Sequence, residues 1–263
     1  MNDLSWIYIS NQATEGTQAN GWRRNHTSEE LLPAVASLRQ SWDAKAFSGQ
    51  RVGMLLEDDM LYPMRITLDQ TPPRKERHHF LLWKLKRHLP YPIEQVTLRY
   101  LPLQQPNTYL TFSLPTPWLE DLDRMFREQG VHCGYVGGLF STLLEEGKSF
   151  RGTTAICFFK DFYLLAQQNS RGGYERFNVR RLPFDAAHRL DFETLLAQDL
   201  FPACAANGAG TVIQLYNFDP DFDDVFRDIS RQLMAQFPSV RMMAAQGSSL
   251  KRFQELLKKG VPA

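Results

Sequence analysis

Residues 84–103 read KLKRHLPYPIEQVTLRYLPL, and this stretch sets the order of the elements around it. Pro90 and Pro92 end a helix, because proline lacks a backbone N–H and its ring clashes with the preceding turn. That helix is predicted over residues 72–89, with two prolines at its first turn. Residues 96–103 follow as a predicted strand, so the stretch contains one junction between a helix and a strand.

The alternation of helix and strand patterns extends in both directions from this junction. Strands are predicted at residues 4–9, near Trp22, at 51–57, 60–68, 96–103, 109–114, 131–135, 154–159, 162–168, 174–182 and 211–216, and near Val240. Helices are predicted at 28–42, 72–89, 116–130, 139–146, 190–203, 220–237 and 248–259. Residues 51–57 and 60–68 are expected to form a hairpin around Asp58-Asp59. Frequent switching between the two periods is typical of a mixed α/β chain.

The composition indicates a globular chain and excludes several other classes. The chain has 263 residues, of which 43% are hydrophobic, too many for a disordered protein. Its net charge of +1 gives no chain-wide attraction for nucleic acid. No apolar run has the length of a membrane span, and MNDLSWIYIS lacks the features of a secretory signal. Cys133, Cys157 and Cys204 are far apart and are expected to be reduced thiols of a cytoplasmic protein.

The stretch at 84–103 resembles the PilM-type actin-like proteins of type IV pilus assembly, in which a helix ends in Leu-Pro-Tyr-Pro and a strand follows. Leu89, Pro90, Tyr91, Pro92 and Val96 stand at the matching positions. The resemblance continues through TYLTFSLP, TPWLEDLDRMFREQG and VHCGYVGGLFSTLLEEG, and in the order of elements after them. The cytoplasmic part of GspL from type II secretion is similar. The resemblance implies a two-lobed α/β fold of the actin-like, ribonuclease H-like ATPase class.

Two lobes are expected from this resemblance, with their boundary in the segment 146–151. The first lobe covers residues 1–147 and contains a small inserted subdomain at 58–115. The second lobe covers residues 148–263. Its last helix can belong to that lobe or pack back on the first one.

The nucleotide-binding loops are where this chain departs from the family. Two hairpin loops of actin-like proteins use Asp-x-Gly to approach phosphate and magnesium, and a Gly-Gly loop lies against adenosine. The first strand here runs WIYISNQ, the second hairpin runs CFFKDFY, and the third loop is Asn217-Phe218-Asp219. Phe158, Phe159 and Lys160 therefore stand where the second phosphate loop is expected. The resemblance thus predicts a fold that is degenerate at the nucleotide site, without catalytic residues, cofactor or metal.

The helix at 72–89 is strongly basic, with six Lys or Arg residues against one Glu and a net charge of +5. Arg77, Lys84 and Arg87 share a face by helical spacing. A solvated helix face is the simplest explanation. The functional alternative is an electrostatic contact of these three residues with anionic lipid headgroups or an acidic partner. Nucleic acid is disfavoured, because the aromatic residues of this helix are expected on its core side.

Four aspartates, Asp219, Asp221, Asp223 and Asp224, begin like a calcium-binding loop. The EF-hand pattern then requires Gly at its sixth position and Glu at its twelfth, where this chain has Asp224 and Ser230. We therefore interpret the cluster as the acidic first turn of a helix, with Asp219 as its capping residue.

Histidine and glycine pairs elsewhere have equally simple explanations. His79 and His88 fall on opposite faces of the basic helix, so they cannot chelate one metal ion. Gly137-Gly138 precedes a helix and indicates either an anion site at its N-terminus or a tight turn.

The function that the resemblance implies is assembly rather than catalysis. The chain would be a cytoplasmic adaptor, peripheral to the bacterial inner membrane, in a type IV pilus, competence or type II secretion machine. Its partner would be the cytoplasmic tail of a PilN-like membrane protein, bound in the groove between the lobes. The alternatives are a divergent actin-like ATPase or kinase with unrecognised nucleotide loops, and a GspL-like module without its anchor.

Overall fold

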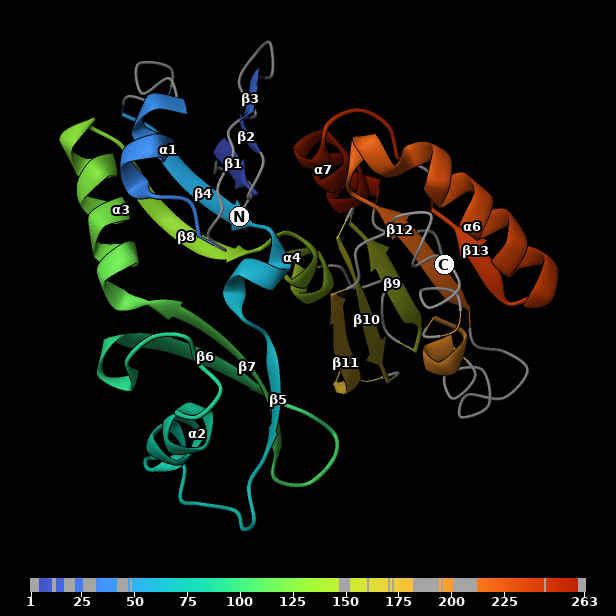
Figure 1. Ribbon diagram of the computed structural model, residues 1–263, viewed down its shortest axis with the longest axis horizontal. Helices are drawn as coiled ribbons and strands as arrows, with labels where there is room; N and C mark the ends of the chain where they lie inside the picture. The colour runs from blue at the N-terminus through green and yellow to red at the C-terminus, as the bar shows by residue number, and fades with distance from the viewer. Residues whose placement is uncertain are drawn as a thin grey trace. The chain divides into compact units, whose positions relative to one another are not determined.

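The computed structural model (Figure 1) describes residues 5–10, 13–16, 22–25, 32–41, 47, 49–146, 152–159, 161–169, 171, 173–181, 194, 196–200, 212–243 and 245–259. The chain forms two compact units: Met1–Pro102 with Pro106–Leu143, and Leu103–Gln105 with Leu144–Ala263. The predicted helix start at Ser28, the predicted lobe boundary at 147, Lys160 and Cys204 lie outside the described residues.

A five-stranded sheet forms the centre of the first unit, in the order β3-β2-β1-β4-β8. Its strands are β1 (Ser5–Ile9), β2 (Ala13–Gly16), β3 (Trp22–Asn25), β4 (Arg51–Leu56) and β8 (His132–Gly138). Strands β1, β2 and β3 are antiparallel, whereas β4 is parallel to both β1 and β8. β2 was not predicted, because its four residues ATEG carry no strand pattern, although all four are buried.

Three helices accompany this sheet: α1 (Val35–Ser41), α3 (Thr116–Glu128) and α4 (Leu139–Glu146). Figure 1 shows α1 and α3 side by side on one face of the sheet. α3 has proline in its first turn, and it buries Leu122, Met125 and Phe126, which share a face at i, i+3 and i+4. Gly130, with a φ of 70°, follows the helix in the left-handed conformation common after helix ends.

A small subdomain is inserted between β4 and α3, with β5 (Met64–Thr67), α2 (Arg77–Leu85), β6 (Val96–Pro102) and β7 (Thr108–Pro115). Its three antiparallel strands follow the order β5-β7-β6. α2 buries Leu81 and Leu85 against Ile66 and Tyr109. The Leu-Pro-Tyr-Pro segment is held to β7, because the Tyr91 hydroxyl donates to the carbonyl of Ser113 at 3.0 Å.

Two sequence predictions in this region are wrong. Residues 51–57 and 60–68 do not form a hairpin, because a 3₁₀ turn at Asp58–Leu61 separates them and β5 pairs with β7 instead. Tyr62, with a φ of 47°, redirects the chain after that turn. α2 is shorter than the predicted 72–89 helix, since turns precede Arg77 and follow Leu85.

The second unit contains another five-stranded sheet, in the order β11-β10-β9-β12-β13. Its strands are β9 (Thr154–Phe158), β10 (Phe162–Gln168), β11 (Tyr174–Arg181), β12 (Ile213–Asn217) and β13 (Val240–Met242). β9, β10 and β11 are antiparallel, and β12 is parallel to β9 and β13. The two sheets therefore share one strand order, an antiparallel meander extended by two parallel strands.

Helices α6 (Asp223–Gln236) and α7 (Ser249–Lys259) and a helical segment at 196–200 belong to the second unit. α6 buries Phe226, Ile229 and Leu233 against the sheet, as their spacing predicts. The predicted cap is also confirmed: the Asp219 carboxylate accepts from the backbone N–H of Asp221 at 2.9 Å. Over the described residues, no helix combines the length and apolar character needed to cross a membrane.

Candidate functional site

The carboxyl ends of parallel strands are where open α/β sheets bind ligands. In the first unit, this edge is formed by the ends of β1, β4 and β8. In the second unit, it is formed by the ends of β9, β12 and β13. The three loops that bind nucleotide in actin-like proteins correspond here to the turn after β1, the turn after β9 and the segment after β12.

The turn after β1 is closed by hydrogen bonds between Ser10 and Ala13. The backbone N–H of Ser10 donates to the Ala13 carbonyl, and the Ser10 hydroxyl accepts from the Ala13 N–H, both at 2.9 Å. Ser10 is buried. Asn11 and Gln12 of the same loop lie outside the described residues. The Ser10 hydroxyl thus forms a hydrogen bond within its own turn.

Asp58, directly after β4, is fully buried and binds the first turn of α4. Its carboxylate accepts the backbone N–H of Phe140 at 2.7 Å and that of Ser141 at 2.8 Å. Burial raises the pKa of Asp58 to about 6, although the two N–H donors and the Ser141 hydroxyl oppose this shift. A carboxylate at a helix N-terminus is favoured by the helix dipole.

Gly138 permits this contact, and this resolves the two interpretations of the Gly137-Gly138 pair. A Cβ on Gly138 would lie 2.3 Å from Oδ1 of Asp58 and 2.5 Å from the Ser141 hydroxyl. The glycine is therefore required by the close approach of Asp58. The anion at the N-terminus of α4 is a side chain of the protein itself.

Aromatic side chains fill the turn after β9. Phe158, Phe159 and Phe162 are all buried. The rings of Phe159 and Phe162 stack at 4.4 Å, and the Phe159 N–H donates to the Phe162 carbonyl at 2.9 Å. Phosphate loops present glycine N–H groups to the ligand, whereas here bulky rings surround the backbone.

The segment after β12 joins the same aromatic cluster. Phe218 is fully buried, its ring lies 6.2 Å from that of Phe159, and its N–H donates to the Phe158 carbonyl at 3.3 Å. The Asn217 amide donates to the Asp219 carbonyl at 2.8 Å and to the Asp223 carboxylate at 2.7 Å. The side chains of the segment after β12 thus bind one another and the neighbouring backbone.

Arg252 of α7 completes this network, although it is only 2% exposed. Its guanidinium donates to both carboxylate oxygens of Asp223, at 2.7 and 2.6 Å. It also donates to the carbonyls of Asn217 at 3.1 Å and Gly247 at 2.7 Å. The hydrogen bonds from Arg252 hold the pKa of Asp223 below its ordinary value.

A second buried ionic cluster surrounds Asp199, outside the strand edge just described. Its carboxylate accepts from the Tyr163 hydroxyl at 2.8 Å, from Arg180 at 3.0 Å and from Arg176. Burial alone would raise the pKa of Asp199, but the hydrogen bonds from Arg180 and Tyr163 and the guanidinium charges bring it below its ordinary value.

Sequence reasoning missed both Arg252 and Asp199, and one signal was available for each. Each occupies a helical position with a buried apolar residue three or four positions away, on the same face. Arg252 precedes Leu256 by four residues, and Asp199 follows Leu196 by three; both neighbours are buried. A charged residue on the apolar face of a helix indicates a buried ion pair, because an unpaired charge there is too costly.

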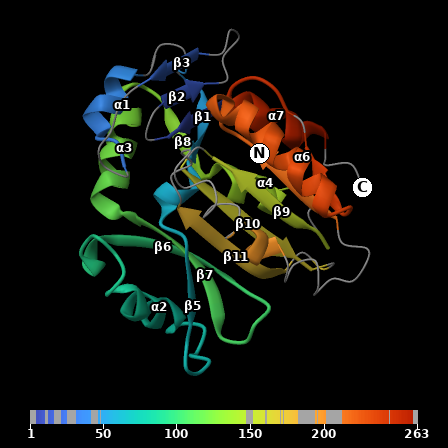
Figure 2. The same cartoon turned by 45° about the vertical axis from the view of Figure 1, so that its right-hand side comes forward.

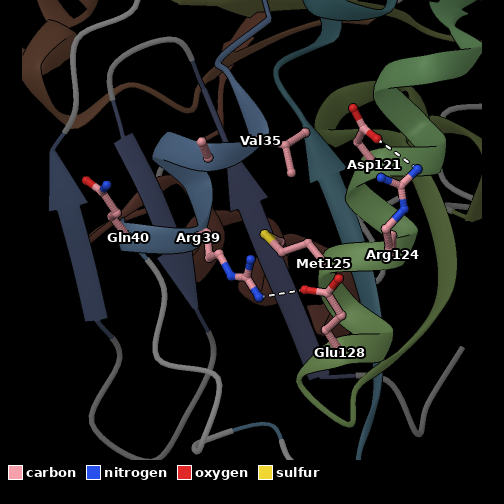
Figure 3. Close-up of a pocket in the computed structure, with 8 residues that line it drawn as sticks. Val35, Arg39, Gln40, Asp121, Arg124, Met125 and Glu128 are labelled. Carbon is pink, nitrogen blue, oxygen red and sulfur yellow. Dashed lines mark hydrogen bonds and ion pairs between the residues drawn. The ribbon is translucent and has the colours of Figure 1, made fainter.

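A cavity of about 420 Å³ lies between α1 and α3, at the surface of the first unit (Figure 3). Its lining is apolar at Val35 and Met125. Ion pairs flank it, with Arg39 bound to Glu128 at 2.6 Å and Arg124 to Asp121 at 3.1 Å. Both carboxylates that line the cavity, Asp121 and Glu128, are thus paired with a guanidinium.

The three basic residues singled out from the sequence, Arg77, Lys84 and Arg87, have different surroundings. The Arg77 guanidinium lies 5.4 Å from the ring centre of Tyr109, and the Lys84 amine pairs with Asp69 at 3.0 Å. Arg87 lies beyond the end of α2 and is exposed. The prediction that the helix aromatics face the core is wrong, since Trp83 is 67% exposed.

The acidic and histidine clusters show no metal-binding geometry. Asp219 caps the following turn and Asp223 binds Arg252, so these two carboxylates have structural partners. Across the part of the chain that the structure describes, no three His, Cys, Asp or Glu side chains are grouped so that they could hold a metal ion.

Comparisons with known proteins show the fold. No protein-family model and no curated protein matches the chain. A PilM–PilN type IV pilus biogenesis complex is similar over 99% of both chains, with a TM-score of 0.60 and 12% identity. A Bacteroides thetaiotaomicron protein with an actin-like ATPase fold and unknown function is similar over 97% of this chain and 95% of that one, with a TM-score of 0.58 and 14% identity.

The cytoplasmic domain of EpsL, an inner-membrane component of the type II secretion system of Vibrio cholerae, is also similar. It covers 97% of this chain and 94% of its own, with a TM-score of 0.53 and 11% identity. The chain therefore has the α/β actin-like ATPase fold over nearly its full length, and the fold class expected from the sequence is confirmed.

Proposed function

We propose that this chain is a non-catalytic assembly protein that uses an actin-like fold as a scaffold. Its role would be that of a cytoplasmic adaptor in a type IV pilus, competence or type II secretion machine. Its partner would be the cytoplasmic tail of a PilN-like membrane protein. This proposal rests on the occupation of the ligand edge by the protein's own side chains.

The network of Asn217, Asp223 and Arg252 is the observation that carries the proposal. An adenosine loop has to leave its backbone open to the base and ribose. Here the carbonyl of Asn217 is bound by a buried guanidinium, and Phe218 stacks on Phe159 beside it. Binding of ATP in this unit would require these side chains to move and a paired buried charge to lose its partner, at a cost of several kcal/mol.

The choice of partner is supported by two of the similar structures. One contains PilM together with PilN, and another is the cytoplasmic domain of an inner-membrane secretion component. A tail segment can bind along a groove or sheet edge through backbone hydrogen bonds and side-chain pockets, without any catalytic group. An adaptor function is therefore compatible with a fold whose strand ends are filled by its own side chains.

Isothermal titration calorimetry with ATP and Mg²⁺ tests the non-catalytic part of the proposal. We expect no binding in the micromolar range. Micromolar binding would instead support the alternative, a divergent actin-like ATPase or kinase.

A binding assay with the cytoplasmic tail of a PilN-like protein encoded beside this gene tests the adaptor part. We expect saturable binding of the tail and none of a peptide with the same composition in scrambled order. Equal binding of both peptides, or of neither, would contradict the proposed partner.

A further inference from the structure

The outer face of α2 combines exposed aromatic residues with positive charge. Trp83 is 67% exposed and Phe80 is 37% exposed, whereas Leu81 and Leu85 on the opposite face are fully buried. α2 covers one face of the sheet β5-β7-β6, as Figure 2 shows. Burial of the inner face anchors the helix, so Trp83 and Phe80 are not needed for the core of the subdomain.

Basic residues flank these two aromatic side chains in the sequence. Lys86 and Arg87 follow α2, Arg74 and Lys75 precede it, and all four are exposed. The Lys84 amine lies 5.7 Å from the centre of the Trp83 ring. The segment 72–89 has six basic residues and one acidic residue, whereas the whole chain has a net charge of only +1. The positive charge is thus concentrated around the exposed indole.

We infer that this face of α2, centred on Trp83 and Phe80 and flanked by Lys86 and Arg87, binds the surface of an anionic lipid bilayer. Tryptophan is favoured at the level of the lipid headgroups, because its ring is apolar and its N–H is polar. Lysine and arginine beside it are attracted to anionic headgroups. The chain would then contact the membrane directly, in addition to any membrane-anchored partner.

Charge complementarity and shape both favour lipid as the ligand. Trp83 projects from the outer side of a helix, where it can enter a soft interface without a preformed pocket. A peptide that binds as an added strand needs the free edge of a sheet, and one that binds as a helix needs a groove. Lys86 and Arg87 do not belong to a strand, so they offer no sheet edge to a peptide. A bilayer rich in anionic lipid can bind the indole ring and the basic side chains at the same time.

Co-sedimentation of the full chain with vesicles tests this inference without any partner protein, so its failure leaves the adaptor test unaffected. The vesicles contain phosphatidylcholine alone or phosphatidylcholine mixed with phosphatidylglycerol. We expect binding to the mixed vesicles, much weaker binding to neutral ones, and loss of binding as salt screens the headgroups. The tryptophan fluorescence should shift to shorter wavelength on binding, and most of this shift should disappear in Trp83→Phe.

Two variants separate the lipid contact from general effects of charge. The double variant Lys86→Glu, Arg87→Glu should weaken binding to the mixed vesicles by at least about tenfold, since each basic residue near the surface contributes about fivefold. Arg227→Glu, Arg231→Glu on α6 makes the same change in net charge at two exposed residues and should leave binding unchanged. Trp83→Ala should weaken binding while its unfolding transition stays that of the wild type.

Three results would overturn the inference. The first is failure of the wild-type chain to bind the mixed vesicles. The second is an equal loss of binding in the two charge-reversal variants. The third is binding of poly-glutamate, dependent on Lys86 and Arg87, without binding to vesicles, which would assign the surface to an acidic protein instead.

Discussion

The two five-stranded sheets share one strand order, but the carboxylates beside them have different hydrogen-bond partners. In the first unit, Asp58 accepts hydrogen bonds from backbone N–H groups at the start of α4, and burial raises its pKa. In the second unit, Asp223 and Asp199 bind arginine side chains, and both have a lowered pKa. The strand order is therefore the same in both units, whereas the carboxylate pKa is raised in the first and lowered in the second.

The two units thus fill the carboxyl ends of their parallel strands with different contacts. The first unit directs its own anion to the helix N-terminus that could otherwise receive one, and Gly138 permits the contact. The second unit places a buried cation, Arg252, behind the strand that would precede an adenosine loop. The scaffold role proposed above rests on these two sets of contacts.

Removal of the Asp199 carboxylate should give the largest effect. Asp199→Ala would leave the buried Tyr163 hydroxyl and the partly buried Arg176 guanidinium without their acceptor, so we expect a loss of about 3–4 kcal/mol in the free energy of unfolding. Urea denaturation measures this loss. Asp228→Ala removes an exposed carboxylate from an i, i+3 pair and should cost less than about 1 kcal/mol. Similar costs for both variants would contradict a dominant role for the buried cluster.

The pH dependence of stability should distinguish the two kinds of carboxylate. The pKa of Asp58 is about 6 in the folded chain, above its ordinary value of 3.8, so the folded state retains a proton that the unfolded state has lost. The stability contributed by this group therefore falls as the pH rises between about 4 and 6, by about 3 kcal/mol. Asp58→Asn should remove this decrease, as shown by urea denaturation at pH 4 and pH 7.

Asp223→Asn provides the opposite case. Because the pKa of Asp223 is lowered, its contribution is present above the ordinary carboxyl pKa and is lost as the pH falls below it. As the pH rises, the free energy of unfolding of the wild-type chain should therefore increase relative to that of Asp223→Asn. Relative to that of Asp58→Asn, it should decrease. The same sign for both variants would contradict the proposed difference between the sheets.

The sequence predicted elements whose patterns are local. The 139–146 helix and the 162–168 strand have the bounds found in the structure, since each is a compact apolar segment between turn residues. The absence of glycine after β9 and β12 could also be read from the sequence, because only the residue types at those positions are needed. The resemblance of the Leu-Pro-Tyr-Pro segment added the fold class, which periodicity alone could not specify.

Contacts between distant residues could not be predicted in this way. Asp58 and Phe140 are separated by 82 positions, and Arg252 and Asp223 by 29. Nothing in the local pattern of α2 showed that Trp83 would be exposed, because the face that a helix buries depends on the strands against which it packs. The sequence thus indicated which segments lack the expected glycines, and the structure shows the side-chain contacts formed there.

The smallest predicted effect concerns the space beside Asp58. Gly138→Ala would place a methyl group 2.3 Å from the carboxylate and should lower the free energy of unfolding by about 1–3 kcal/mol, because Asp58 is fully buried and cannot withdraw easily. Gly173→Ala is the matched control in the second unit: its methyl would lie 3.1 Å from the Asn169 side-chain nitrogen, so the half-buried Asn169 side chain has to shift by only a few tenths of an ångström. Urea denaturation of the two variants compares these costs. If Gly173→Ala were as costly as Gly138→Ala, the close approach of Asp58 to α4 would not be what requires glycine at position 138.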